Sequence, residues 1–108
     1  MTQNYTIKDI IDKVKKNKRW PDVKMIQRAY NYAVEKHGDQ KRKSGEPYII
    51  HPTNVAYTIA ELGLDEKTIC AALLHDVVED TVATYEDIEK EFGTEIAEMV
   101  VGVTKLKM

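Results

Sequence analysis

The chain has 108 residues and a formal net charge of −2, with 31% charged and 43% hydrophobic residues. This length fits one small domain or a piece of one, because a second folded core needs more residues. The near balance of charges argues against a general nucleic-acid binder, because sequence-independent binding to phosphates needs a net positive charge. A local basic patch is still allowed.

Cysteine usage and hydropathy indicate the compartment. Cys70 is the single cysteine, and no stretch approaches the roughly 20 apolar residues of a transmembrane helix. Residues 1–12 are polar and carry acids, unlike a secretory signal or a transit peptide. We therefore expect a cytoplasmic protein that binds no membrane and no nucleic acid, with Cys70 as a small buried residue.

Hydrophobic spacing predicts helices along nearly the whole chain, so the expected fold class is all-α, a helical bundle. A first helix is expected at about residues 6–16, and a second begins with Pro21 at its first position and stops near Gly38. Trp20, just before this helix, is expected to pack as an anchor. The polar stretch from Asp39 to Pro47 predicts a loop.

Helical spacing resumes at Pro52 and ends at Gly63, where a left-handed cap costs little. Asp65 is expected to cap the next helix, which reaches about Glu79. Residues 71–78 of that helix are apolar almost all round, apart from one histidine and one aspartate. The helix should therefore lie in the centre of the bundle.

Two further helices are expected toward the end of the chain. Thr84 and Asp87 resemble a capping box for a helix that leads to Phe92 and Gly93. Thr94 then begins a last helix.

The pair His75 and Asp76 is the most informative feature, because it interrupts an apolar helix. Burying an unpaired carboxylate costs several kcal/mol, which is comparable to the whole stability of a small domain. A divalent cation would compensate for this cost, and imidazole and carboxylate are normal ligands of zinc, manganese or iron. His51, where the preceding loop enters its helix, is the natural third ligand. The alternative is that His51 and His75 are core histidines with ordinary hydrogen bonds.

Glu79 and Asp80 follow His75 and Asp76 by four residues each, so they stand one turn further along the same face. Such an arrangement suits a metal ion that lowers the pKa of a water molecule and a carboxylate that orients the water or takes its proton. The alternative is that Glu79 and Asp80 only mark the exposed end of the helix, although acids there oppose the helix dipole.

The stretch from Lys41 to Tyr48 is the second functional candidate. It collects three cations beside a flexible turn and an aromatic ring, just before His51. Such a loop could hold a polyphosphate and stack a base on Arg42. A short basic loop is otherwise an ordinary solvated surface.

Six segments follow one another along the chain: His37-Gly38-Asp39-Gln40, Arg42 to Tyr48, His51-Pro52, Ala71 to Thr81, Phe92-Gly93 and Gly102 to Leu106. Together they resemble the N-terminal hydrolase domain of the RelA/SpoT homologues, a helical HD domain, over about residues 29–106. Enzymes of this family make and degrade guanosine tetra- and pentaphosphate.

The resemblance implies a manganese-dependent hydrolysis of the 3′-pyrophosphate of these alarmones to GDP or GTP and pyrophosphate. It implies metal ligation by His51, His75 and Asp76, and activation of the attacking water by Glu79 and Asp80. Nucleotide contacts would come from Arg42 and Lys43, with Ser44 and Tyr48 lining the pocket. His37 is expected to serve structure.

The family's fourth metal ligand is an aspartate on a later helix, and Asp87 lies in the wrong motif to replace it. We therefore expect the 108 residues to be the N-terminal part of an HD hydrolase domain that alone binds metal weakly and turns over slowly or not at all. An incomplete bundle also exposes an apolar face, through which a homodimer could form.

Two other functions remain open from the sequence. One is an HD-type phosphohydrolase acting on another nucleotide. The other is a metal-free helical module that binds a partner.

Overall fold

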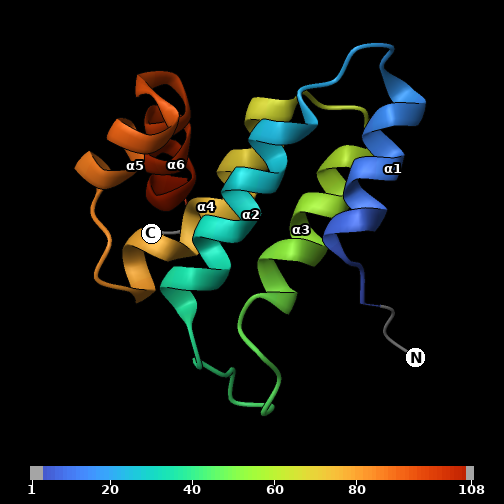
Figure 1. The fold of residues 1–108 in the computed structure, drawn as a ribbon. Coiled ribbons are helices and arrows are strands. Elements are labelled where there is room, and N and C mark those ends of the chain that lie inside the picture. Colours follow the sequence, from blue (N-terminus) through green and yellow to red (C-terminus); the bar gives the residue numbers. More distant parts are fainter. Residues whose placement is uncertain (1–3, 107–108) are drawn as a thin grey trace.

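The computed structural model describes residues 4–106, and their side chains as far as residue 102. Within that part of the chain all regular structure is helical, which confirms the all-α fold class (Figure 1). The helices are α1 (Ile7–Asn17), α2 (Val23–His37), α3 (Ile50–Glu61), α4 (Glu66–Asp80), α5 (Tyr85–Phe92) and α6 (Thr94–Leu106).

Side-chain caps set the starts of four of the described helices, α1, α2, α4 and α5. Thr6 forms a capping box with Asp9 before α1, and Thr84 forms one with Asp87 before α5. Asp65 accepts a hydrogen bond from a backbone N–H of the first turn of α4. The predicted caps at Asp65 and Thr84 are therefore confirmed.

Helices α2 and α3 do not begin at the predicted residues, Pro21 and Pro52. Pro21 lies outside α2, which is instead capped by the Asp22 side chain. Helix α3 begins at Ile50, so that Pro52 stands in its first turn. A proline is tolerated there because the first N–H groups of a helix have no partner within the helix.

Trp20 does not pack as an anchor, so that prediction is wrong. Its side chain is 80% exposed on the connection between α1 and α2, and the nearby Arg19 guanidinium lies 5.7 Å from its ring centre. Helix α1 is anchored instead by Ile10 and Val14, which are buried in the core.

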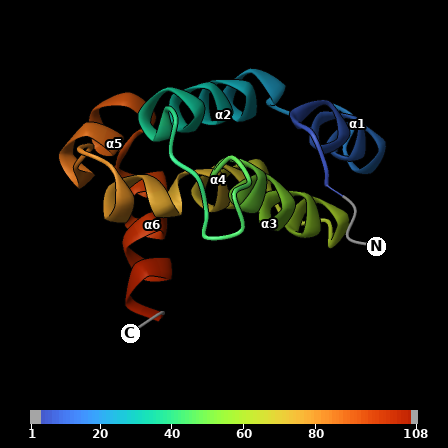
Figure 2. The same ribbon diagram turned by 90° about the horizontal axis from the view of Figure 1, so that it is seen from below.

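Helix α4 occupies the centre of the bundle, as its apolar sequence predicts. All residues from Ile69 to Val77 are buried, Cys70 among them. The helix packs against α2, α3 and α6, while α1 packs mainly on α3 and α5 packs on α6 (Figure 2). Of the helices in residues 4–106, none is both long and apolar enough to cross a bilayer.

The connection from α2 to α3, residues 38–49, passes the C-terminal end of α4 (Figures 1 and 2). We call it the basic loop. An isolated antiparallel bridge joins Lys41 to Pro47, and Gly45 turns the chain between them with φ of 92°. A positive φ of this size favours glycine. The predicted loop is thus confirmed, and its two sides are joined by backbone pairing.

Candidate active site

His75 and Asp76 are side by side on α4, where their exposed fractions are only 6% and 2%. The Nδ1 atom of His75 lies 2.6 Å from the carbonyl oxygen of Ala72. A carbonyl only accepts, so Nδ1 carries a proton and donates. In the neutral ring this leaves the Nε2 lone pair available, and that is the tautomer a metal-binding histidine needs.

The Nε2 atom of His75 is 3.2 Å from the Oδ1 atom of Asp76. With Nδ1 already protonated, a neutral ring would aim a lone pair at a negatively charged oxygen. This approach is favourable only if a positive charge lies there, either a second proton on the ring or a metal ion that both atoms bind. The donor chemistry therefore fits a cation.

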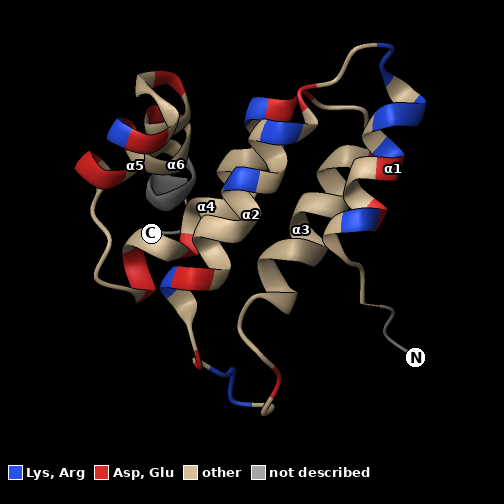
Figure 3. Ribbon diagram, viewed as in Figure 1, with Lys and Arg blue, Asp and Glu red and all other residues tan. Residues whose placement is uncertain are grey.

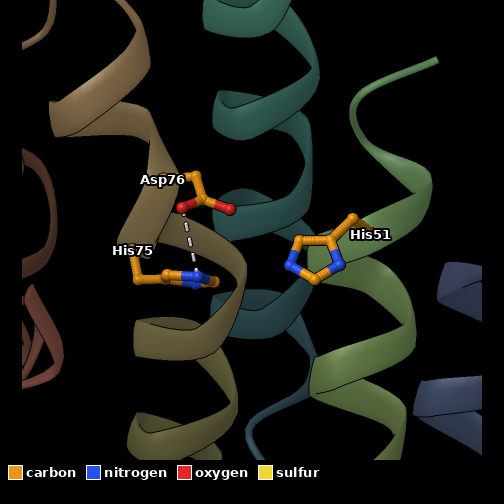
Figure 4. Close-up of side chains that lie close together, drawn as sticks. All are labelled: His51, His75 and Asp76. Carbon is orange, nitrogen blue, oxygen red and sulfur yellow. Dashed lines mark ion pairs between the residues drawn. The ribbon is translucent and has the colours of Figure 1, made fainter. Parts of the chain in front are cut away.

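His51 approaches the pair from the first turn of α3 (Figure 4). Its ring centre is 6.3 Å from that of His75, and His51, His75 and Asp76 offer ligand atoms that all lie within 4.8 Å of one another. Two imidazole nitrogens and a carboxylate oxygen form a set that fits zinc, manganese or iron.

A second group of possible ligand atoms shares Asp76. Glu79 and Asp80 also lie within 4.8 Å of it, counted between one oxygen atom of each residue. Both are exposed and belong to the last turn of α4, where acidic residues are visible in Figure 3. Because a helix C-terminus already carries partial negative charge, this concentration of acids is unfavourable without cations nearby.

Tyr48 connects the basic loop to this acidic end. Its hydroxyl donates to the Oδ2 atom of Asp80 at 2.8 Å. Burial, the hydrogen bond to Asp80 and the negative charge of Asp76 all raise the pKa of Tyr48. The hydroxyl therefore stays protonated at neutral pH and acts as a donor.

Cations gather in the basic loop (Figure 3). A surface hollow of about 540 Å³ is lined by Lys41, Arg42, Lys43, Ser44 and Tyr48. Three cationic side chains around a hollow of this size suit a phosphate-bearing ligand. Since Tyr48 lines the hollow and also contacts Asp80, the predicted nucleotide residues and the predicted carboxylates lie at one end of the molecule.

The sequence did not single out Gln40 as a site residue. Its amide nitrogen donates to the backbone carbonyl of Asp80 at 2.6 Å, and its side-chain oxygen is 3.1 Å from Nδ1 of His37. His37 is buried at 3% exposure and stacks on Tyr48, with 4.6 Å between the ring centres. The only sequence signal for Gln40 was its place in the family segment from His37 to Gln40.

The structure thus brings the three predicted metal ligands together and places the two predicted catalytic acids beside Asp76. Asp87, which was excluded as a ligand, is occupied in the capping box of α5. The family segment that begins at Gly102 continues into residues 103–106, whose side chains lie outside those described.

Comparison with known proteins identifies the family. The model of the HD domain matches residues 29–108. A protein from Aquifex aeolicus (strain VF5), named guanosine-3′,5′-bis(diphosphate) 3′-pyrophosphohydrolase, is 65% identical over 81 residues, or 75% of this chain and 12% of that protein. The bifunctional (p)ppGpp synthase/hydrolase SpoT of Escherichia coli (strain K12) is 55% identical over 84 residues, or 78% of this chain and 12% of that protein.

A solved structure supports the same relationship. It belongs to a metazoan orthologue of SpoT described as hydrolysing ppGpp and playing a role in starvation responses. The TM-score is 0.66 at 40% identity, and the match covers 76% of this chain and 48% of that one. The chain spans only about an eighth of the length of the curated relatives. With a family model matched over most of its length and RelA/SpoT-type enzymes among its relatives, this chain belongs to the HD-domain family.

Proposed function

We propose that this protein hydrolyses the 3′-pyrophosphate of guanosine tetra- or pentaphosphate, releasing pyrophosphate and leaving GDP or GTP. The observation that carries the proposal is the convergence of His51, His75 and Asp76, with ligand atoms within 4.8 Å of one another. The names of the relatives supply the substrate, and the cationic hollow beside this group suits a ligand with several phosphates.

Each residue has a role that follows from its position. His51, His75 and Asp76 would hold a divalent metal, which when bound lowers the pKa of water and stabilises negative charge on phosphate oxygens. Glu79 and Asp80 would orient the attacking water and take its proton. Arg42 and Lys43 would neutralise the phosphates, with Ser44 and Tyr48 lining the pocket.

We further propose manganese as the metal and the cytoplasm as the compartment. Manganese accepts mixed nitrogen and oxygen ligands of this kind, and the choice among manganese, zinc and iron rests on the family resemblance. A cytoplasmic setting accords with a free cysteine that is buried rather than paired.

Pyrophosphate release from guanosine tetraphosphate tests the proposal. It is measured with added Mn²⁺, with and without chelator, and other nucleotides serve as a substrate panel. Because the chain spans 12% of the Aquifex relative, the assay is run on the 108 residues and on a chain lengthened with the sequence that follows the match in that relative. We expect metal-dependent hydrolysis by the lengthened chain and little or none by the 108 residues.

Asp76→Asn is the decisive variant, since it removes the charge without changing the volume. It should abolish hydrolysis and also the rise in melting temperature that Mn²⁺ produces by binding the folded state. Asp12→Asn, at an exposed position on α1, is the matched control and should retain both. Failure of both chain lengths to bind metal or to turn over any nucleotide would leave the non-catalytic helical module as the better explanation.

A further inference from the structure

The basic loop is fastened to the last turn of α4 by two side-chain hydrogen bonds. The Gln40 amide donates to the backbone carbonyl of Asp80 at 2.6 Å, and the Tyr48 hydroxyl donates to its Oδ2 atom at 2.8 Å. That carbonyl is one of the last four of the helix, which have no partner within it. Both the main chain and the carboxylate of Asp80 are therefore held by one loop.

Gln40 and Tyr48 form the base of the loop, and the cations form its tip. The Tyr48 N–H donates to the Gln40 carbonyl at 3.0 Å, next to the bridge between Lys41 and Pro47. Closer to the tip, the N–H of Arg42 donates to the carbonyl of Glu46 at 2.9 Å. These backbone hydrogen bonds hold the two sides of the loop together, so that a movement of the tip also moves the base.

His37 fixes the orientation of both donors. The carbonyl of Asp80 can only accept, so the amide nitrogen of Gln40 must face it and the amide oxygen must face His37. The Nδ1 atom of His37 then donates to that oxygen across 3.1 Å. The same buried ring stacks on Tyr48 at an interplanar angle of 20°.

We infer that Gln40 and Tyr48, oriented by His37, are positioning residues that set the carboxylate of Asp80 and link it to the cationic tip of the basic loop. The hydrogen bond from the Tyr48 hydroxyl restricts the rotation of the Asp80 carboxylate, which keeps further acceptor capacity for a water molecule. An anionic ligand on the tip and the acid at the end of α4 then move as one unit. The role of Asp80 in catalysis rests on the proposed function, whereas the link itself can be measured without turnover.

Amide hydrogen exchange, followed by NMR on the ligand-free chain, tests the link. Tyr48→Phe keeps the ring that stacks on His37 and removes only the hydroxyl, and Gln40→Leu removes the amide at similar volume. Each should speed exchange at the backbone N–H groups of positions 42 and 48, which close the loop, by about tenfold. The matched controls Tyr57→Phe and Gln27→Leu, on α3 and α2, should leave these rates unchanged.

Titration with inorganic pyrophosphate gives the second measurement. In the unaltered chain the amide resonances of residues 41–46, of Tyr48 and of Glu79 and Asp80 should shift together with one apparent Kd. In Tyr48→Phe and Gln40→Leu the amide resonances of the basic loop should still shift on addition of pyrophosphate, while the shifts of Glu79 and Asp80 become smaller. Unchanged exchange rates with an undiminished response in both variants would overturn the inference.

Kinetics separate this inference from the proposed function. In the form of the protein that hydrolyses guanosine tetraphosphate, Tyr48→Phe should lower kcat about tenfold and leave KM within about twofold. If the two variants keep the original kcat while the unaltered protein is active, the inference fails and the function stands. If no form is active but the exchange and titration results hold, the function fails and the link stands.

Discussion

The buried thiol of Cys70 lies on the central helix, away from any partner cysteine. Burial, assisted by the nearby negative charges of Asp22 and Glu66, raises its pKa to about 12. Because the thiolate is the reactive species, the folded protein should not react with a thiol reagent such as Ellman's reagent at pH 8. One equivalent should react after unfolding in guanidinium chloride. Rapid reaction of the folded chain would contradict the buried position.

The pKa of the Glu66 carboxyl makes the free energy of unfolding depend on pH. Burial alone would raise its pKa, but hydrogen bonds from the backbone N–H of Asp22 and from the Lys18 ammonium outweigh burial and lower the pKa. A carboxyl with a lowered pKa stabilises the fold above its unfolded pKa, about 4.3, and this stabilisation is lost as the pH falls through the folded pKa.

Glu66→Gln should therefore lower the free energy of unfolding by about 2 kcal/mol at pH 7, measured by urea denaturation. The difference from the unaltered protein should shrink as the pH falls from about 5 to 3. Glu86→Gln, at an exposed position on α5, is the matched control and should have little effect at either pH. A difference that stays constant down to pH 3 would argue against the hydrogen-bonded carboxylate.

Single residues show what could be predicted of the site. The cost of burying charge pointed to Asp76 and His75 from the sequence alone, because their apolar neighbours already predicted a central helix. The role of Gln40 could not be predicted in this way. A polar residue in a loop has many equivalent partners in water, and only the folded chain shows that its partner is a carbonyl 40 positions away.

At the scale of helices, capping residues predicted the starts of α4 and α5, whereas the packing of Trp20 could not be predicted from local signals. The capping boxes work through residues three positions apart, so the sequence contains all their atoms. The exposure of Trp20 depends on what lies across the α1–α2 connection, which hydrophobicity alone does not reveal. A large apolar side chain beside a helix start is therefore weak evidence for packing.

The cap of the central helix can be tested directly. Asp65 accepts a hydrogen bond from the N–H of Thr68 at 2.9 Å. Asp65→Ala should lower the free energy of unfolding by about 1 kcal/mol, measured by denaturation followed by circular dichroism. Glu61→Ala, at the exposed end of α3, should change it much less. Equal effects of the two substitutions would show that the cap does not stabilise α4.

At the scale of the whole molecule, α4 links most of the other helices, since α2, α3 and α6 all pack on it. Leu73 on this helix is fully buried, so Leu73→Ala should cost about 3 kcal/mol through lost contacts and a cavity. Val82→Ala, where the side chain is 91% exposed, should cost far less. Urea denaturation at neutral pH measures both, and a small effect of Leu73→Ala would contradict the central place of α4.

The exposed indole of Trp20 has a practical consequence for all such measurements. It is the only tryptophan of the chain, and it meets water in the folded state much as it does in the unfolded state. Its fluorescence should therefore change little in wavelength when the protein unfolds, and an emission-based melting curve would understate the transition. The same property makes Trp20 a natural optical reporter for anything that docks on the α1–α2 connection, with almost no background from the core.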